Sequence, residues 1–153
     1  MQTYTKRTPL SVKEDNDCVV RSIMTATGLS YIESHRFCTQ WLDREFKDGV
    51  QYLENKLSCP KVRSQLFAMG YQIDPINCYY WRAWDGSLQS MNIGRFCKSY
   101  PKGTYIIHIS GHALVIKNGT VHDWPELAKK LQRKVLYAWE VKSNFQLEIP
   151  FPE

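Results

Sequence analysis

Three residues of this chain, Cys18, His112 and Asp123, are of the types that together perform nucleophilic catalysis. A cysteine attacks as a thiolate, but a free thiol is mostly protonated at neutral pH, so it needs a base beside it. A histidine serves as that base, and a carboxylate holds the histidine in the required tautomer and orientation. The chemistry would be acyl transfer to the Cys18 thiol, provided that the surrounding elements bring the three side chains together.

Cys18 is expected at the N-terminus of a short helix. Residues 15–17 are Asp, Asn and Asp, which all favour the N-cap position. Apolar residues recur at helical spacing over 18–27, and Gly28 follows as a stop signal. A helix N-terminus favours negative charge, so this position would promote the thiolate form of Cys18.

His112 and Asp123 are expected on the two strands of a hairpin. Asn118-Gly119 is the two-residue turn most typical of β-hairpins, and apolar and β-branched residues flank it. His112 lies six residues before Asn118, and Asp123 lies four residues after Gly119. Both side chains should therefore lie near the same end of the hairpin, within reach of an orienting hydrogen bond.

The remaining elements predict helices first and strands later, which favours an α+β fold with N-terminal helices followed by an antiparallel sheet. Ser30 and Glu33 form a capping box that starts a second helix. In chain order, the predicted elements are helices at 18–27, 30–47, 50–57 and 60–70, a loop or edge strand at 71–86, a helix at 87–100, strands at 104–109, 113–117 and 120–122, a short helix at 123–132, and a strand at 135–141. No domain boundary interrupts residues 1–153.

The composition predicts a soluble globular protein. The chain has 153 residues, of which 43% are hydrophobic and 23% charged, and this length is enough for one domain with a real core. No apolar run approaches the roughly 18 residues of a membrane span. The first residues lack the apolar segment of a secretory signal. We therefore expect a cytoplasmic protein without a membrane partner.

The net charge of +5 does not by itself indicate a nucleic-acid partner. The densest basic cluster is Lys129, Lys130, Arg133 and Lys134, which would share one face of a helix. A solvated helix face explains this cluster more simply than a docking surface for nucleic acid or an acidic partner. No nucleic-acid-binding motif accompanies it.

The five cysteines are expected to be reduced thiols, because their number is odd and no signal peptide precedes them. No Cys-x-x-Cys pair is present, so a structural zinc site is not expected. A metal site from Cys18, His112 and His122 would lack a close-spaced pair of ligands. We expect neither a metal nor a cofactor.

These residues resemble the papain-like cysteine peptidases, in particular the bacteriocin-leader peptidases of export transporters and small papain-like proteins encoded by bacteriophages. The resemblance rests on residues 17–21 (DCVVR), 27–31 (TGLSY), 103–107 (GTYII), 110–113 (SGHA) and 118–123 (NGTVHD). It covers roughly the first 35 residues and 103–124. The segment between them resembles no family that we can name.

The resemblance implies a single papain-like domain with Cys18 as nucleophile, His112 as general base and acid, and Asp123 as the residue that orients His112. It implies a cysteine hydrolase, foremost a peptidase, that acts on a protein or peptide in a bacterial or phage-infected host cytoplasm. Deamidases, acyltransferases and transglutaminase-like enzymes use the same triad, so the reaction class stays open.

The chain departs from the papain-like pattern at the oxyanion site. Papain-like enzymes place a glutamine about six residues before the cysteine, and Val12 stands there in this chain. Asn16 is the nearest side-chain amide, and the backbone N–H of Cys18 is a second possible donor. Loss of one oxyanion donor costs about 10²–10³ in rate. The alternative is therefore an inactive papain-like scaffold that binds a host or viral protein.

An aromatic stretch at residues 79–84 is a further candidate for binding. Trp81 and Trp84 would line a substrate-binding wall, because exposed aromatic side chains favour recognition. Burial in the core or in an edge strand is the simpler explanation. In the inactive alternative, this stretch or the basic cluster would contact the partner.

Each residue of the proposed triad also has a structural explanation. Cys18 would be a buried helix cysteine, His112 a histidine with its hydrogen bonds satisfied at a strand end, and Asp123 a helix N-cap before Trp124. His122 should point to the opposite face of its strand from Asp123.

Overall fold

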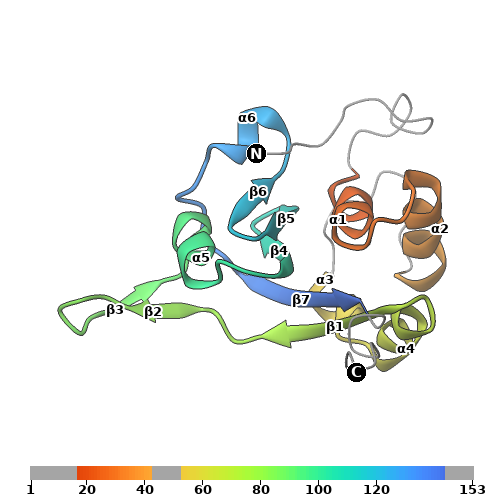
Figure 1. Cartoon of the computed structure of the whole chain (residues 1–153), viewed down its shortest axis with the longest axis horizontal. Helices are drawn as coiled ribbons and strands as arrows, with labels where there is room; N and C mark the ends of the chain where they lie inside the picture. The colour runs from red at the N-terminus through yellow and green to blue at the C-terminus, as the bar shows by residue number, and fades with distance from the viewer. Residues whose placement is uncertain (1–16, 43–52, 144–153) are drawn as a thin grey trace, which may run out of the picture.

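The computed structural model describes residues 17–42 and 53–143 (Figure 1). Helices come first and an antiparallel sheet follows, so the predicted α+β class is confirmed. The elements are α1 (Cys18–Thr27), α2 (Tyr31–Trp41), α3 (Leu53–Leu57), α4 (Pro60–Ala68), β1 (Tyr71–Ile76), β2 (Tyr80–Arg82), β3 (Leu88–Ser90), α5 (Ile93–Ser99), β4 (Thr104–Ile109), β5 (His112–Lys117), β6 (Thr120–His122), α6 (Pro125–Ala128) and β7 (Tyr137–Ser143).

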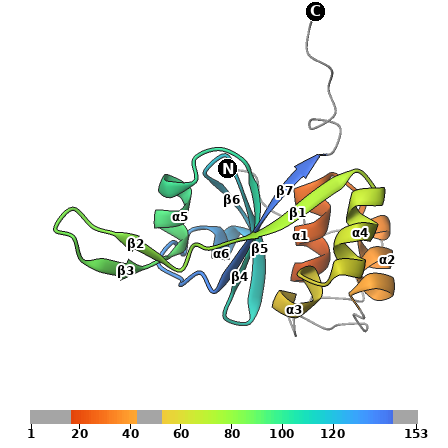
Figure 2. The ribbon, with the colours of Figure 1, turned by 90° about the horizontal axis from the view of Figure 1, so that it is seen from below.

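Five of these strands form one sheet in the order β1-β7-β4-β5-β6, and each neighbouring pair is antiparallel. Strands β2 and β3 form a separate two-stranded hairpin. Figure 2 shows α1, α2, α3 and α4 on one side of the sheet, with α5 and the β2–β3 hairpin on the other. The sheet therefore buries apolar side chains on both faces.

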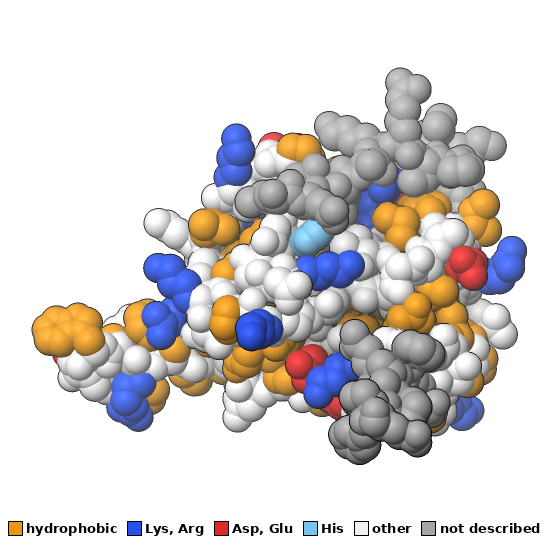
Figure 3. Space-filling model, in the orientation of Figure 1, with side chains coloured by type: hydrophobic (Ala, Val, Ile, Leu, Met, Phe, Trp, Pro, Cys, Tyr) orange, Lys and Arg blue, Asp and Glu red, His pale blue; other side chains and the backbone are white. Residues whose placement is uncertain are grey.

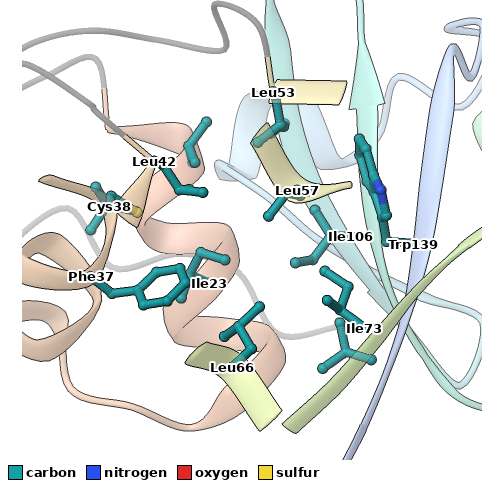
Figure 4. Close-up of a cluster of buried hydrophobic side chains, with 14 of the residues drawn as sticks. Ile23, Phe37, Cys38, Leu42, Leu53, Leu57, Leu66, Ile73, Ile106 and Trp139 are labelled. Atoms are coloured by element: carbon teal, nitrogen blue, oxygen red, sulfur yellow. The ribbon is translucent and has the colours of Figure 1, made fainter. Parts of the chain in front are cut away.

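Neighbouring residues of β4 contribute to two different cores, because successive side chains of a strand point to opposite faces. Ile106 packs with the helices, together with Ile23, Leu66 and Trp139 (Figure 4). Ile107 packs on the opposite face in the cluster that contains Phe96 of α5. Burial of each such side chain contributes about 1.5–3 kcal/mol, so α1 is held firmly against the sheet.

The N-terminal helices begin where the sequence predicts. α1 starts at Cys18 and stops at Gly28, whose φ is 84° and whose N–H donates to the Met24 carbonyl. The capping box at Ser30 and Glu33 is present in both directions. Asp17 occupies the N-cap position of α1, but its side chain makes no capping hydrogen bond. The prediction that residues 15–17 supply the N-cap is thus confirmed in position, although the Asp17 carboxylate accepts from Arg21 and Tyr31 rather than from a helix N–H.

Two predicted helix boundaries differ from the structure. α2 ends at Trp41 with Leu42 as its C-cap, and residues 43–47 of the predicted helix lie outside the described residues. The helix expected over 87–100 is wrong in its first part, because β3 pairs with β2 there. α5 begins only after Asn92, whose side chain accepts from the Arg95 N–H as a cap.

In the last part of the chain, α6 is shorter than predicted and β7 begins later than predicted. α6 ends at Ala128 instead of near residue 132. Lys129, Lys130, Arg133 and Lys134 therefore do not share one helix face, as the sequence had indicated. β7 begins at Tyr137, and residues 133–135 instead contact the loop before α5 through their backbone.

Candidate active site

Cys18 lies at the start of α1 and is only 5% exposed. The first N–H groups of a helix have no acceptor within the helix. The Arg21 N–H donates to the Asp17 carbonyl at 2.9 Å and so begins the helical hydrogen bonds. Because the Asp17 side chain does not cap this end, the partial positive charge of the helix N-terminus acts on the surroundings of the thiol.

His112 and Asp123 meet through the hairpin that the sequence predicts. Asn118 and Gly119 have φ values of 49° and 75°, as the tight turn between β5 and β6 requires. Val115 pairs with His122, so Asp123 follows directly after the paired region and reaches diagonally toward the start of β5. His112 Nε2 lies 2.7 Å from Asp123 Oδ1.

Asp123 is completely buried, and both of its carboxylate oxygens have donors. Oδ1 also accepts from the Trp124 backbone N–H at 2.8 Å. The Arg133 guanidinium lies 3.4 Å from Oδ2. Arg133 is itself held by hydrogen bonds to the carbonyls of Lys130 and Leu127, each at 2.8 Å. A buried carboxylate needs such partners to offset the loss of water.

The protonation of His112 reflects its neighbours. Burial alone would lower the pKa of His112, but hydrogen bonds to Asp123 and Cys18 and the negative charges of these groups outweigh it. The pKa of His112 rises to about 9 as a result. Because Nε2 faces Asp123, Nδ1 is the ring nitrogen left for Cys18. The three side chains thus form a continuous series of contacts.

The structure does not bring every candidate residue to this site. Asn16 lies outside the described residues. Trp81 is on β2, where the Arg95 guanidinium lies 4.0 Å from its ring centroid. Trp84 is 98% exposed in the loop of the β2–β3 hairpin. Figure 1 shows that this hairpin projects away from α1, and Figure 3 shows hydrophobic side chains at its outer end.

The predicted substrate-binding wall is thus not next to Cys18 in this structure, because the hairpin extends from the opposite side of the sheet to α1 (Figure 2). The exposed apolar side chains of the hairpin include Tyr80, Trp84 and Leu88. Tyr80 and Leu88 lie on one face of the ribbon, since Tyr80 pairs with Ser90 and Leu88 pairs with Arg82.

Four residues around the site do not follow from the sequence patterns. The sequence places Arg133 in the basic cluster, although Arg133 contacts Asp123. The other three residues are Arg21, Tyr31 and Trp124. The sequence holds one signal for Arg21, which interrupts the apolar run of α1. The structure shows that this arginine is 0% exposed. No sequence signal indicated that Trp124 or Arg133 would approach these elements.

Within residues 17–42 and 53–143, no group of three or more His, Cys, Asp or Glu side chains is arranged to hold a metal ion. None of the helices in that part of the chain has the length and apolar character needed to cross a bilayer. In comparisons with known proteins, no family model matched the chain, and neither a curated protein nor a solved structure did.

Proposed function

We propose that the protein is a papain-like cysteine hydrolase, foremost a peptidase, in which Cys18 is the nucleophile. The observation that carries this proposal is the series of contacts from Cys18 through His112 to the buried Asp123. A base beside the nucleophile, itself oriented by a third group, is the arrangement that nucleophilic catalysis needs. His112 supplies the base, and Asp123 keeps its ring in position.

The reaction follows from these positions. The Cys18 thiolate attacks the acyl carbon of a peptide or related bond, and a carbon–sulfur bond forms. His112, as imidazolium, gives its proton to the leaving amine, and the carbon–nitrogen bond breaks. Water then attacks the thioester while the neutral His112 accepts a proton from it. Cleavage of the carbon–sulfur bond releases the acid and restores the thiolate–imidazolium pair.

The raised pKa of His112, about 9, supports this division of roles. At neutral pH the imidazolium form predominates, so the proton for the leaving group is already present. Asp123 stabilises that form through the 2.7 Å contact with Nε2. In the proposed reaction, this positively charged ring lies beside the sulfur of Cys18.

The oxyanion would be stabilised by the backbone rather than by a glutamine. The Cys18 N–H lies at the start of α1, where helical N–H groups have no acceptor within the helix. The Asp17 carboxylate does not cover these groups as a cap. A developing negative charge beside Cys18 would therefore have the helix N-terminus to interact with.

A reducing compartment suits this chemistry. All five cysteines are free thiols. Proteins of the cytoplasm keep cysteines in this form, whereas secreted proteins tend to pair them. We therefore propose that the protein acts in a bacterial or phage-infected cytoplasm on a protein or peptide substrate.

Alkylation with limiting iodoacetamide across pH, mapped to each cysteine by mass spectrometry, tests the proposal without a substrate. We expect Cys18 to react selectively below neutral pH and to lose this selectivity in His112→Ala. Cys78 and Cys97 are internal controls, because burial raises the pKa of both thiols, for Cys78 to about 11. Cys18→Ala identifies the modified peptide. Equally slow labelling of several cysteines, unchanged in His112→Ala, would contradict the proposal.

The β2–β3 hairpin favours a second candidate, an inactive papain-like scaffold that binds a host or viral protein. Its exposed apolar side chains, Tyr80, Trp84 and Leu88, suit an interface. An unreactive Cys18 in the alkylation experiment would favour this candidate.

A further inference from the structure

Arg21 is a fully buried arginine on α1, one helical turn after Cys18. Burial of a guanidinium is costly unless it is paired and hydrogen-bonded. Its Nε donates to Asp17 Oδ2 at 3.0 Å, and the exposed fractions of the two side chains are only 0% and 1%. Asp17 directly precedes the candidate nucleophile. Arg21 is thus bound to the residue that leads into Cys18.

Two aromatic rings complete the surroundings of Arg21. Its guanidinium carbon lies 5.1 Å from the ring centroid of Tyr31 on α2 and 4.8 Å from that of Trp124. The Tyr31 hydroxyl donates to the same Asp17 oxygen at 2.7 Å. A planar guanidinium can face aromatic rings while its edge bonds a carboxylate, and a lysine ammonium cannot reproduce this combination.

These contacts join the two halves of the candidate active site. Trp124 directly follows Asp123, and its backbone N–H donates to the carboxylate oxygen that also meets His112. Asp17, at the other end, is adjacent to Cys18. Arg21 therefore connects the nucleophile helix to the turn that carries the orienting carboxylate, although these segments are far apart in the sequence.

A buried ion pair is by itself weak evidence of a role in stability. Replacement of a buried ion pair by apolar side chains of similar volume is often neutral or even stabilising. The ion pair also compensates the charge of Asp17, which would otherwise lie buried and unpaired directly before Cys18. Both considerations point to a role in the site rather than in the core.

We propose that Arg21 is a positioning residue that sets the approach of His112 to Cys18, by holding the turn at Asp123 and Trp124 against α1. This inference rests on the proposed function for its catalytic meaning. The geometric part, the dependence of His112 on Arg21 and Trp124, can be measured without any turnover.

The test follows the imidazole pKa of His112 by NMR titration and the alkylation rate of Cys18 with iodoacetamide. Arg21→Met keeps the volume but removes the charge, and Trp124→Leu removes one ring contact at a partly exposed position. We expect both variants to move the pKa of His112 from about 9 toward 6.5 and to slow Cys18 alkylation at least about tenfold. Arg21→Lys should rescue only part of the loss.

Arg63→Met is the matched control. Arg63 also forms an ion pair, at 2.6 Å with Asp74, but its side chain is 42% exposed on α4. This variant should leave the pKa of His112 and Cys18 alkylation unchanged. If Arg21→Met fails to fold, Trp124→Leu decides the question, because a general loss of stability does not selectively change a histidine titration in the folded protein.

The inference is overturned if, in folded Trp124→Leu or Arg21→Met, the pKa of His112 and the alkylation rate of Cys18 equal those of the wild type. Failure of the proposed function would give different alkylation results. In that case wild-type Cys18 is alkylated slowly and His112→Ala changes nothing, while the effect of Arg21 on the His112 titration is still read by NMR.

Discussion

Nε2 of His112 lies 2.7 Å from Oδ1 of Asp123, and this carboxylate is completely excluded from solvent. The contact joins the start of β5 to the residue directly after β6. It leaves Nδ1 of the imidazole for Cys18, whose hydrogen bond contributes to the raised pKa of His112. The orientation of one histidine ring therefore links a helix N-terminus to a buried anion.

Asp123→Asn tests the role of this carboxylate. The amide keeps the shape but loses the charge that holds the imidazolium, so the pKa of His112 should fall from about 9 toward 6.5. Alkylation of Cys18 below neutral pH should then slow substantially, and turnover of any substrate should drop on the order of 10²–10⁴-fold. Asp74→Asn, at an exposed ion pair on β1, is the control that should change neither quantity.

Stability should depend on pH through His112. Its pKa is about 9 in the folded protein and 6.5 ordinarily, so its stabilising contribution is complete below pH 6.5 and is lost as pH rises to about 9. This loss is on the order of 3 kcal/mol in the free energy of unfolding. Denaturant unfolding of the wild type and of His112→Gln across this range measures it. The same pH dependence in both proteins would contradict the assignment.

Arg133→Met should destabilise the protein by about 1–3 kcal/mol, because the buried Asp123 loses a partner and the Leu127 and Lys130 carbonyls lose a donor. Its effect on Cys18 alkylation should be smaller than that of Asp123→Asn, since Oδ1 keeps its contacts. Thermal unfolding and alkylation measure the two effects. Lys129→Met, an exposed neighbour, is the control. An unchanged melting temperature in Arg133→Met would contradict this expectation.

Gly119→Ala should disturb the site through the hairpin turn. Gly119 has a φ of 75°, and an added Cβ would meet the Cys97 carbonyl oxygen at 3.3 Å. We expect a destabilisation of about 1–2 kcal/mol together with a lower pKa of His112, because the turn sets the register of β5 and β6. Gly86→Ala is the control, because Gly86 has a similar φ of 86° and an added Cβ there would have no atom within 4 Å. It should cost stability without an effect on His112.

Trp84→Ala should leave both stability and Cys18 alkylation unchanged. The side chain is 98% exposed, and exposed substitutions usually change the free energy of unfolding by less than about 0.5 kcal/mol. Calorimetry and the alkylation assay check this. A marked loss of Cys18 reactivity would contradict this expectation.

Local signals explain how much of the site was predictable. The positive φ values of Asn118 and Gly119 follow from residue types that tolerate them, and these place Asp123 near His112. The start of α1 at Cys18 was equally predictable, because it depends on the neighbouring N-cap residues. The boundary between β3 and α5 was not, because the residues that became β3 suit a helix until they pair with β2.

The sequence by itself determined the hairpin that pairs His112 with Asp123 and the helix that begins at Cys18, because turn chemistry and hydrophobic periodicity act over a few neighbouring residues. Only the tertiary structure decided that α1 packs against the sheet, that Cys18 therefore meets His112, and that Arg21 lies against Trp124. These contacts join residues far apart in the chain, and they depend on how the apolar faces of helices and sheet fit together.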